Sequence, residues 1–387
     1  MKYAFIASDF MPKVGGISQF IYGLISQLPP EQVVAIAPPT PGWESFDARQ
    51  GFPIYRLLAQ KAWAQSVRNT KWMLPQFFLQ LRKLPDVDLV VCGHGTLSLM
   101  LAAYLNKKRR GTPFAVFLHG LDFLGVNGRP QWPIYKLLLQ SADMVFPNSS
   151  MMKTAVHQST NVHPDKLHLI HPCIMENELQ VTVSPDTLRQ ELGLENKFVL
   201  LTVARLTKAK GLDTVIRALP EVIATIPQAH YLVLGDGPAG PDLEALAEAY
   251  KVRSNISFLG AKAHAEVANF LAMSDLFVMT PHKNPDTVNV ESFGIVYLEA
   301  NFLKLPVVAS AAGGIPDAVK HEESGLLVAP GQPTELAKAV IRLWWDDGLV
   351  QRLVAYGYER VLQQFTSAAV ARRFQQAATH GLKGLND

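Results

Sequence analysis

Short apolar runs alternate with longer segments of helical composition along most of the chain. The runs in the first part cover residues 3–7, 33–37, 54–57, 89–92, 114–118, 144–147 and 167–170. Those in the second part cover residues 198–203, 231–234, 256–259, 276–279, 307–309 and 326–328. Short apolar runs separated by helices are typical of parallel strands, which are buried on both faces of a sheet. The pattern therefore predicts an α/β protein.

This pattern is interrupted by a polar stretch at residues 173–186, after which it starts again. The chain of 387 residues is also too long for a single hydrophobic core. We therefore predict two doubly wound α/β domains, residues 1–178 and 179–364, that face one another. The last segment, residues 365–387, is expected to form a helix that packs back on the first domain.

The charge is unevenly divided between the two halves. Residues 1–180 contain 17 Lys and Arg against 11 Asp and Glu, a net charge of +6, and the remaining 19 and 22 give −3. A basic first half suits an anionic surface or acceptor on that side, although uneven solvation explains the difference as well. The apolar content of 48% and the net charge of +3 exclude an intrinsically disordered chain.

Residues 60–84 mix basic with aromatic side chains, which predicts an amphipathic helix interrupted at Pro75. Such a helix either rests on an anionic membrane or packs its aromatic side inward. The apolar residues 3–7 are too short for a secretion signal, and no run approaches the roughly 18 residues of a membrane span. With only Cys92 and Cys173 present, the chain fits a reducing cytoplasm, with any membrane contact peripheral and at the inner face of the cell membrane.

Two features of the first half are candidates for ligand binding. Gly15 and Gly16 stand between the first predicted strand and a helix, where backbone N–H groups can approach an anion. They do not form a dinucleotide fingerprint, and a plain strand-to-helix turn explains them too. His119 follows the strand at 114–118, at the end of a strand where open α/β sheets place ligands, although a lone histidine is more often structural.

Two carboxylates, Glu291 and Glu299, stand eight positions apart with Gly294 between them. Glu291 is expected in a loop just before a helix, and Glu299 about two turns inside it. The first turn of that helix offers unpaired backbone N–H groups and a positive dipole end, which suits an anionic ligand. Taken alone, the spacing is more typical of a surface helix with two solvated glutamates.

Cations and glycines are predicted on the same edge of the second sheet. Arg205 and Lys210 lie in the loop after the strand at 198–203, where two cations can neutralise a diphosphate. Glycines also end the next two predicted strands. Because the carboxyl ends of parallel strands meet at one edge, these groups, Glu291 and Glu299 are expected to converge there.

Taken together, these residues resemble glycosyltransferase family 4. The resemblance rests on Gly15-Gly16, His119, Arg205 followed by Lys210-Gly211, and the Glu291-x7-Glu299 pair, in this order. It implies the GT-B fold, in which two Rossmann-like domains hold a nucleotide-sugar donor in the cleft between them, and a retaining reaction. Residues 289–300 most resemble bacterial mannosyltransferases that act on phosphatidylinositol mannosides and similar acceptors.

The resemblance implies a role for each motif residue. Arg205 and Lys210 would bind the donor diphosphate and stabilise it as it leaves. Glu291 would hold hydroxyls of the transferred sugar, and Glu299 would bind the ribose hydroxyls. His119 would contact the sugar near its 6-hydroxyl or anomeric side. Backbone groups would complete the donor site, from Gly15, Gly16, Lys262, Phe293, Gly294 and Ile295.

The expected reaction transfers a hexose to a hydroxyl of a lipid-linked or saccharide acceptor, with GDP-mannose favoured as donor and a UDP-glucose-type sugar next. No D-x-D motif stands in a plausible metal position, so we expect no metal and no other cofactor, with Arg205 and Lys210 in its place. A GT-B sugar-nucleotide 2-epimerase and a non-catalytic nucleotide-sugar-binding protein are the alternatives. The basic residues match no nucleic-acid reading element, so no nucleic-acid partner is expected.

Overall fold

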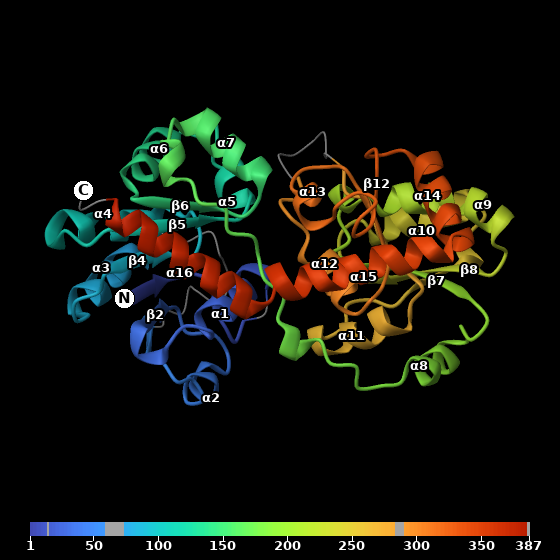
Figure 1. The fold of residues 1–387 in the computed structure, drawn as a ribbon, viewed down its shortest axis with the longest axis horizontal. Helices are drawn as coiled ribbons and strands as arrows, with labels where there is room; N and C mark the ends of the chain where they lie inside the picture. The colour runs from blue at the N-terminus through green and yellow to red at the C-terminus, as the bar shows by residue number, and fades with distance from the viewer. Residues whose placement is uncertain (14, 59–72, 283–289, 385–387) are drawn as a thin grey trace. The chain divides into compact units, whose positions relative to one another are not determined.

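The computed structural model describes residues 1–13, 15–58, 73–282 and 290–384. It divides the chain into two compact units, which are colour-graded along the sequence in Figure 1. Unit 1 comprises Met1–Cys173 together with Ser367–Asp387, and unit 2 comprises Ile174–Thr366. Each unit contains a six-stranded sheet in which all paired strands are parallel.

The sheet of unit 1 has the strand order β3-β2-β1-β4-β5-β6. Its strands are β1 (Tyr3–Ile6), β2 (Val33–Ala37), β3 (Ile54–Arg56), β4 (Leu89–Cys92), β5 (Phe114–Leu118) and β6 (Met144–Pro147). The order reverses between β1 and β4, which creates a crevice at the carboxyl ends of these strands. The central strands are buried along their whole length, because helices cover both faces.

The two faces of this sheet have separate cores. On one face, α1 (Gly16–Ile25) packs against α16 (Ser367–Lys383), and both helices contribute to a core around β1, β2 and β5. On the other face, α3 (Met73–Lys83), α4 (Leu97–Arg110), α6 (Trp132–Ser141) and α7 (Ser150–Thr160) supply the core. The short helices α2 (Trp43–Asp47) and α5 (Leu121–Leu124) complete the unit.

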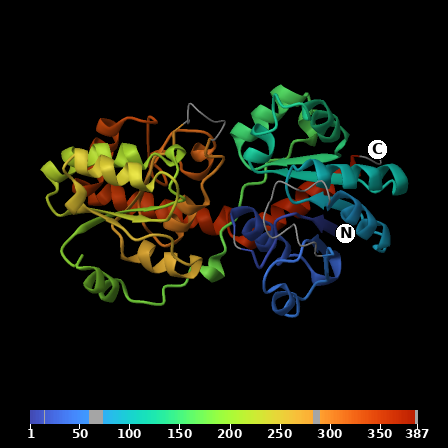
Figure 2. The same cartoon turned by 180° about the vertical axis from the view of Figure 1, so that it is seen from behind.

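Unit 2 repeats this architecture with the order β12-β11-β10-β7-β8-β9. Its strands are β7 (Phe198–Val203), β8 (Ala229–Leu234), β9 (Ile256–Phe258), β10 (Leu276–Met279), β11 (Val307–Ser310) and β12 (Leu326–Val328). One face is covered by α9 (Leu212–Thr225), α10 (Gly240–Ala249), α14 (Pro333–Trp345) and the first half of α15 (Asp347–Gln364). The other is covered by α8 (Pro185–Leu192), α11 (His264–Met273), α12 (Ile295–Phe302) and α13 (Ile315–Ala318). Figure 2 shows α9 and α10 side by side from behind.

Several predicted elements differ in detail from the structure. Residues 167–170 form only an isolated bridge between Leu167 and Val145, so this predicted strand is wrong. Pro75 does not interrupt α3 but lies in its first turn, where the missing N–H costs no hydrogen bond. The rest of the amphipathic segment, residues 60–72, lies outside the described residues. The helix α13 has no counterpart among the predicted elements.

Candidate functional site

The loop between β7 and α9 is held against the end of β10 by Gly211. This glycine has φ +70°, and a Cβ atom added to it would lie 1.8 Å from the carbonyl oxygen of Thr280. The hydroxyl of Thr280 donates a hydrogen bond to the Gly211 carbonyl at 3.0 Å. Only glycine fits this contact, so the loop that carries Arg205 and Lys210 is fixed to the neighbouring strand.

Lys210 and Glu291 form the centre of the candidate site. The Lys210 ammonium lies 2.6 Å from Oε2 of Glu291, and both side chains are partly exposed. The backbone of Glu291 is also fixed, because its carbonyl accepts a hydrogen bond from Gly314 at 2.9 Å. A Cβ atom at Gly313 would lie 2.2 Å from the same carbonyl oxygen. The pair is therefore a placed cation beside a placed carboxylate, and it brings together two of the residues that were predicted to converge at one edge of the sheet.

The helix α12 begins at Ile295, four residues after Glu291, and presents its first turn to this edge of the sheet. Gly294 is its N-cap, with φ +89° and no side-chain cap, and a Cβ atom there would lie 2.5 Å from the ring of Tyr297. The Tyr297 hydroxyl donates to the carbonyl of Met279 at 2.9 Å. Phe293 is buried against Phe365, so its side chain belongs to the core and only its backbone can reach a ligand. Ile295 is half-buried.

Glu299 has very different surroundings from Glu291. Since α12 begins at Ile295, Glu299 lies about one turn inside the helix and not two as predicted. Its side chain is buried, and this burial raises the pKa of its carboxyl. His264 at 3.9 Å opposes that shift, whereas Glu178, 3.6 Å from the same imidazole, adds to it. His264 and Glu178 could not be predicted from the sequence, because both are far from Glu299 in the chain.

The loops that follow β8 and β9 are tied together on the same edge. The N–H of Gly235 donates to the carbonyl of Gly260 at 2.8 Å, and Asp236 accepts from the N–H of Ala261 at 3.0 Å. Lys262, in the second of these loops, is exposed, and its ammonium lies 6.0 Å from the centre of the Phe270 ring. Arg205 is also exposed.

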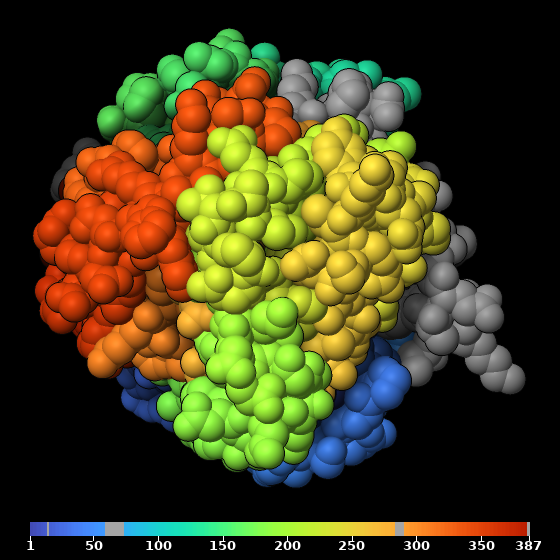
Figure 3. All heavy atoms as spheres, turned by 90° about the vertical axis from the view of Figure 1, so that its right-hand side faces the viewer, coloured from blue at the N-terminus to red at the C-terminus, as the bar shows by residue number. Residues whose placement is uncertain are grey.

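A separate pocket of about 350 Å³ lies beside Lys208, between α9 and α10. These helices form part of the outer surface of unit 2 that faces the viewer in Figure 3. The pocket is lined by aliphatic side chains and by charged groups of both signs, including Asp213 and Arg217. None of the predicted site residues lines it. Lys208 therefore lines this pocket, whereas Lys210, two positions further along the chain, pairs with Glu291.

His119 lies in unit 1, directly after β5. Its Nε2 is 2.8 Å from the carbonyl oxygen of Gly93, so this nitrogen must carry a proton and donate. Its backbone N–H donates to Asp122 at 2.9 Å. Burial lowers the pKa of the imidazole, against the opposing effects of Asp122 and the Gly93 carbonyl. His119 is therefore a neutral, oriented imidazole at the carboxyl edge of the sheet, with its one N–H directed at Gly93 and Nδ1 as the acceptor.

His94, which the sequence analysis missed, lies on the same edge after β4. Its Nε2 is 2.8 Å from the hydroxyl of Ser8, and burial lowers the pKa of its imidazole to about 4. Asp122 opposes this shift and also accepts from the N–H of Gly95 at 2.9 Å. The available signal was its position between two glycines at the end of a predicted strand.

Gly15 and Gly16 occupy the start of α1 without any packing reason for glycine. Gly15 has extended backbone with φ −179°, which any residue adopts. A Cβ atom at Gly16 would meet nothing within 4 Å. The hydroxyl of Ser18 closes the turn by donating to the carbonyls of Lys13 and Gly15, at 2.6 and 2.9 Å. The space beside the first turn of α1 is therefore open to a ligand.

Among the described residues, no group of three or more His, Cys, Asp or Glu side chains is arranged to hold a metal ion. Within the same residues, no helix is both long and apolar enough to cross a membrane.

Comparison with known families identifies the class of protein that carries this set of residues. The model of glycosyltransferase family 4 matches residues 14–177, and the model of glycosyl transferases group 1 matches residues 184–360. Together they span both units. The chain is a family 4 glycosyltransferase.

Relatives of this glycosyltransferase extend over nearly the whole chain. It is 27% identical over 352 residues to the GDP-mannose-dependent monoacylated alpha-(1-6)-phosphatidylinositol monomannoside mannosyltransferase of Corynebacterium glutamicum, covering 89% of each chain. It is 25% identical over 371 residues to the GDP-mannose-dependent alpha-(1-6)-phosphatidylinositol monomannoside mannosyltransferase of Mycobacterium tuberculosis, covering 93% of each. These matches confirm the resemblance to this group of mannosyltransferases.

Solved structures confirm the GT-B fold of the glycosyltransferase. Anabaena Alr3699/HepE in complex with UDP superposes with a TM-score of 0.80 at 21% identity, covering 98% of this chain and 100% of that one. Sucrose-phosphate synthase from Thermosynechococcus elongatus superposes with a TM-score of 0.76 at 22% identity, covering 99% and 100%.

Proposed function

We propose that the protein is a retaining, metal-independent hexosyltransferase that uses a nucleotide-diphosphate sugar and a lipid-linked or saccharide acceptor. The observation that carries the proposal is the Lys210–Glu291 pair beside the first turn of α12. A cation and free backbone N–H groups suit the diphosphate, and a carboxylate next to them suits sugar hydroxyls. GDP-mannose is the first choice of donor because the names of two relatives specify it. A UDP-sugar is the second choice, since HepE binds UDP and UDP-glucose.

The proposed mechanism assigns charge stabilisation to fixed groups of the protein. Breaking the bond between the sugar and the diphosphate builds positive charge on the sugar and negative charge on the leaving phosphate. Arg205, Lys210 and the N–H groups at Gly294 and Ile295 stabilise the leaving phosphate once the Lys210 ammonium has passed from Glu291 to the diphosphate. We assign the charge-neutralising role of a metal to these cations. The acceptor's proton goes to the leaving phosphate on the same face of the sugar, so no covalent nucleophile is required.

Glu291 and Glu299 divide the recognition of the donor in this proposal. Lys210 holds Glu291 in place before the donor binds, and the diphosphate then takes over the ammonium while Glu291 accepts from sugar hydroxyls. Glu299, buried beside His264, accepts from the ribose hydroxyls. Lys262, in the loop after β9, contributes backbone to the nucleobase loop. At the start of α1, Gly15 and Gly16 are assigned backbone N–H contacts with the phosphate.

His119 contributes an acceptor, Nδ1, to a hydroxyl of the transferred sugar, because its Nε2–H donates to the Gly93 carbonyl and the ring is neutral. The reaction is placed in the cytoplasm, where nucleotide sugars and reduced thiols coexist. The two cysteines, Cys92 and Cys173, support this placement because both are buried thiols and neither is part of a disulfide.

A donor screen followed by one matched pair of variants tests the proposal. Nucleotide sugars are ranked by the thermal shift they cause, and the best is assayed for transfer to lipid and saccharide acceptors with and without EDTA. Lys210→Ala is expected to lower kcat about 100-fold, because it removes a donor that acts on developing charge. Lys208→Ala, two positions away in the separate pocket, serves as the control and is expected to retain activity.

Three results would contradict the proposal. Equal losses in the two lysine variants would show that the pair with Glu291 is not the centre of the site. Loss of activity in the presence of EDTA would contradict the metal-independent mechanism. Conversion of the donor to an isomerised nucleotide sugar without any acceptor would instead indicate an epimerase.

A further inference from the structure

We propose that the outer surface of α3, α4 and α6 is a docking surface for an anionic phospholipid membrane. This inference rests on the proposed function, since a membrane bound by the enzyme would hold a lipid-linked acceptor close to it. It rests on the exposed residues of these helices and of Leu58, which we call the α3–α4–α6 face.

Within its three helices, the α3–α4–α6 face carries only positively charged side chains. These helices contain seven Lys and Arg and no Asp or Glu, namely Arg82, Lys83, Lys107, Lys108, Arg109, Arg110 and Lys136. The one ion pair of this set in the described residues joins Lys107 to the buried Asp143 at 2.6 Å. Asp86 and Asp88 follow α3 and are exposed, with Asp88 bound by the N–H of Lys2. The charge of the face is thus strongly positive.

The basic residues gather at one edge because of the topology. The three helices connect parallel strands, so they run in one direction and their last turns lie at the same edge of the sheet. Arg82 and Lys83 end α3, and residues 107–110 end α4. The guanidinium of Arg110 joins these two ends by donating to the carbonyls of Leu84 and Arg82, both at 3.0 Å.

Large aliphatic side chains are exposed next to this basic edge. Leu79 is 49% exposed one turn before Arg82, and Leu105 is 38% exposed one turn before Arg109. On α6, Ile134 and Leu137 are 55% and 53% exposed. Leu58, 76% exposed, lies beside α3 because its N–H donates to Gln76 at 2.8 Å.

An anionic membrane fits both properties of the α3–α4–α6 face. Leucine side chains insert at the level of the headgroups, and lysine and arginine side chains contact lipid phosphates. An acidic protein or a nucleic acid would use the cations but not a row of exposed leucines across three helices. The charge complementarity and the aliphatic row together select the membrane.

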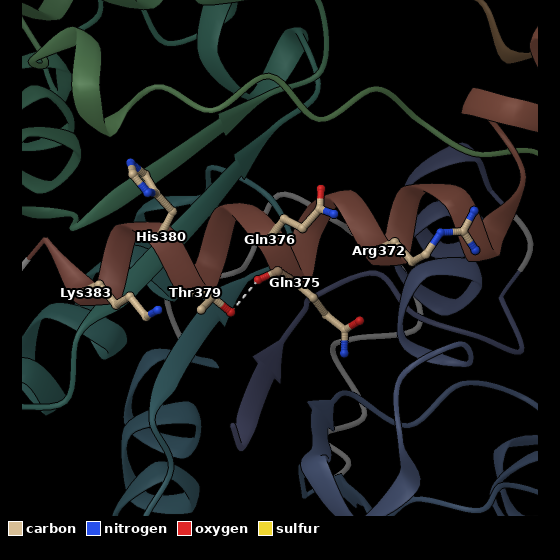
Figure 4. A pocket seen from close by; sticks show the side chains of 6 residues that line it. All are labelled: Arg372, Gln375, Gln376, Thr379, His380 and Lys383. Carbon is tan, nitrogen blue, oxygen red and sulfur yellow. Dashed lines mark hydrogen bonds between the residues drawn. The ribbon is translucent and has the colours of Figure 1, made fainter.

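Unit 1 offers a matched control on its opposite face. The helix α16 bears a shallow hollow of about 450 Å³ lined by Arg372, Gln375, Gln376, Thr379, His380 and Lys383 (Figure 4). It is basic like the α3–α4–α6 face, but all of its lining side chains are polar. Lys83 and Arg109 can therefore be compared with Lys383 and Arg372, which are also exposed.

The test is sedimentation with vesicles of phosphatidylcholine, with and without phosphatidylglycerol, in the absence of any donor. The wild-type protein is expected to bind only the vesicles that contain phosphatidylglycerol, and less strongly at high salt. The K83Q/R109Q variant should lose about 25-fold in partition coefficient, because each cation near the surface contributes about fivefold. The R372Q/K383Q variant should bind like wild type.

A third variant separates the membrane from other anionic partners. The L79Q/L105Q/L137Q variant keeps every charge and changes only exposed residues, so it should fold like wild type. Because it removes the aliphatic side chains that would enter the membrane, its vesicle partition coefficient should fall by about tenfold or more. If it binds like wild type, the face is a general anion surface for an acidic protein or nucleic acid, and the membrane proposal fails. The proposal also fails if wild type does not bind, if it binds pure phosphatidylcholine equally well, or if the control pair loses as much.

The vesicle assay and the transferase assay fail independently. Vesicle binding needs no donor and no chemistry, so its loss leaves the proposed transfer reaction standing. Conversely, a protein that binds vesicles through the α3–α4–α6 face but transfers no sugar would contradict the proposed function alone.

Discussion

Glu291 and Glu299 are the two residues whose separate roles can be distinguished by kinetics. Glu291 is partly exposed and paired with Lys210, whereas Glu299 is buried with a raised pKa. We expect Glu291→Gln to lower kcat, because it weakens contacts with the sugar that change during transfer. We expect Glu299→Gln to raise the KM for the donor with little change in kcat, because ribose contacts persist through the reaction. Equal effects of both variants on kcat and KM would contradict this division.

His94 should lower the free energy of unfolding as the pH falls from about 6.5 to about 4. Its folded-state pKa is lowered from 6.5 to about 4 by burial. Between these values the unfolded chain binds a proton that the native imidazole does not, so the unfolding free energy falls as the pH drops. The loss amounts to at most about 3 kcal/mol and is complete near pH 4. Below that pH, His94 contributes no further change.

Denaturant titrations between pH 7 and pH 4 measure this effect. Carboxylates titrate in the same range, so the informative quantity is the difference between wild type and His94→Gln, which keeps a hydrogen-bonding group near Ser8. The variant should show a shallower decline. Parallel curves for the two proteins would show that the imidazole titrates normally in the native state.

At the scale of single elements, α12 depends on the glycine that starts it. Gly294 has φ +89°, and its added Cβ atom would lie 2.5 Å from the Tyr297 ring. Gly294→Ala should therefore displace the first turn of α12 and raise the KM for the donor. Gly111 provides the control, since it has φ +75° but open space around its Cβ position. Gly111→Ala should cost about 1–2 kcal/mol of stability through backbone strain alone and leave the donor KM unchanged.

Thermal unfolding and donor titration of both alanine variants distinguish the two effects. A larger loss of stability in Gly294→Ala than in Gly111→Ala would reflect the collision with Tyr297. If both variants bind the donor like wild type, the first turn of α12 does not contact it.

Elements were predictable where a local pattern determines them. Twelve of the predicted strands have counterparts in the two sheets, because short apolar runs between helices indicate buried parallel strands. The run at 167–170 has the same local pattern but makes only one bridge, to Val145. The run lies beside β6, because the N–H groups of His168 and Ile170 donate to the carbonyls of Val145 and Pro147 at 3.0 and 3.1 Å. A local apolar pattern therefore does not determine how much of a strand ladder forms.

The candidate site was predictable only as far as topology brings strand ends together. Lys210 and Glu291 were expected on one rim, and they lie 2.6 Å apart. The pairing of Glu299 with His264 was not accessible from the sequence, because it depends on how α11 and α12 pack on the sheet. The same holds for the contact between His94 and Ser8, which joins residues 86 positions apart.

At the scale of the whole molecule, the last helix completes the core of the first unit. The chain leaves unit 1 at Cys173 and returns to it at Ser367, after forming all of unit 2. On α16, Phe374 is fully buried and its ring centre lies 5.3 to 6.0 Å from those of Tyr3, Phe5, Phe117 and Phe146. The sheet of unit 1 therefore closes its core with residues from the other end of the chain.

This arrangement predicts that a change in α16 weakens unit 1 selectively. Phe374→Ala should lower the stability of unit 1 by about 3–5 kcal/mol, the cost of a large cavity among aromatic rings. Gln376→Ala, exposed on the same helix, should stay within about 0.5 kcal/mol of wild type. Hydrogen exchange read by peptide gives each unit its own value, so faster exchange should be confined to residues 1–173 and 367–384. Among the described residues, unit 2 contributes none to this core. Equal acceleration in the peptides of unit 2 would therefore mean that the two units unfold as one cooperative body, which would contradict a selective effect on unit 1.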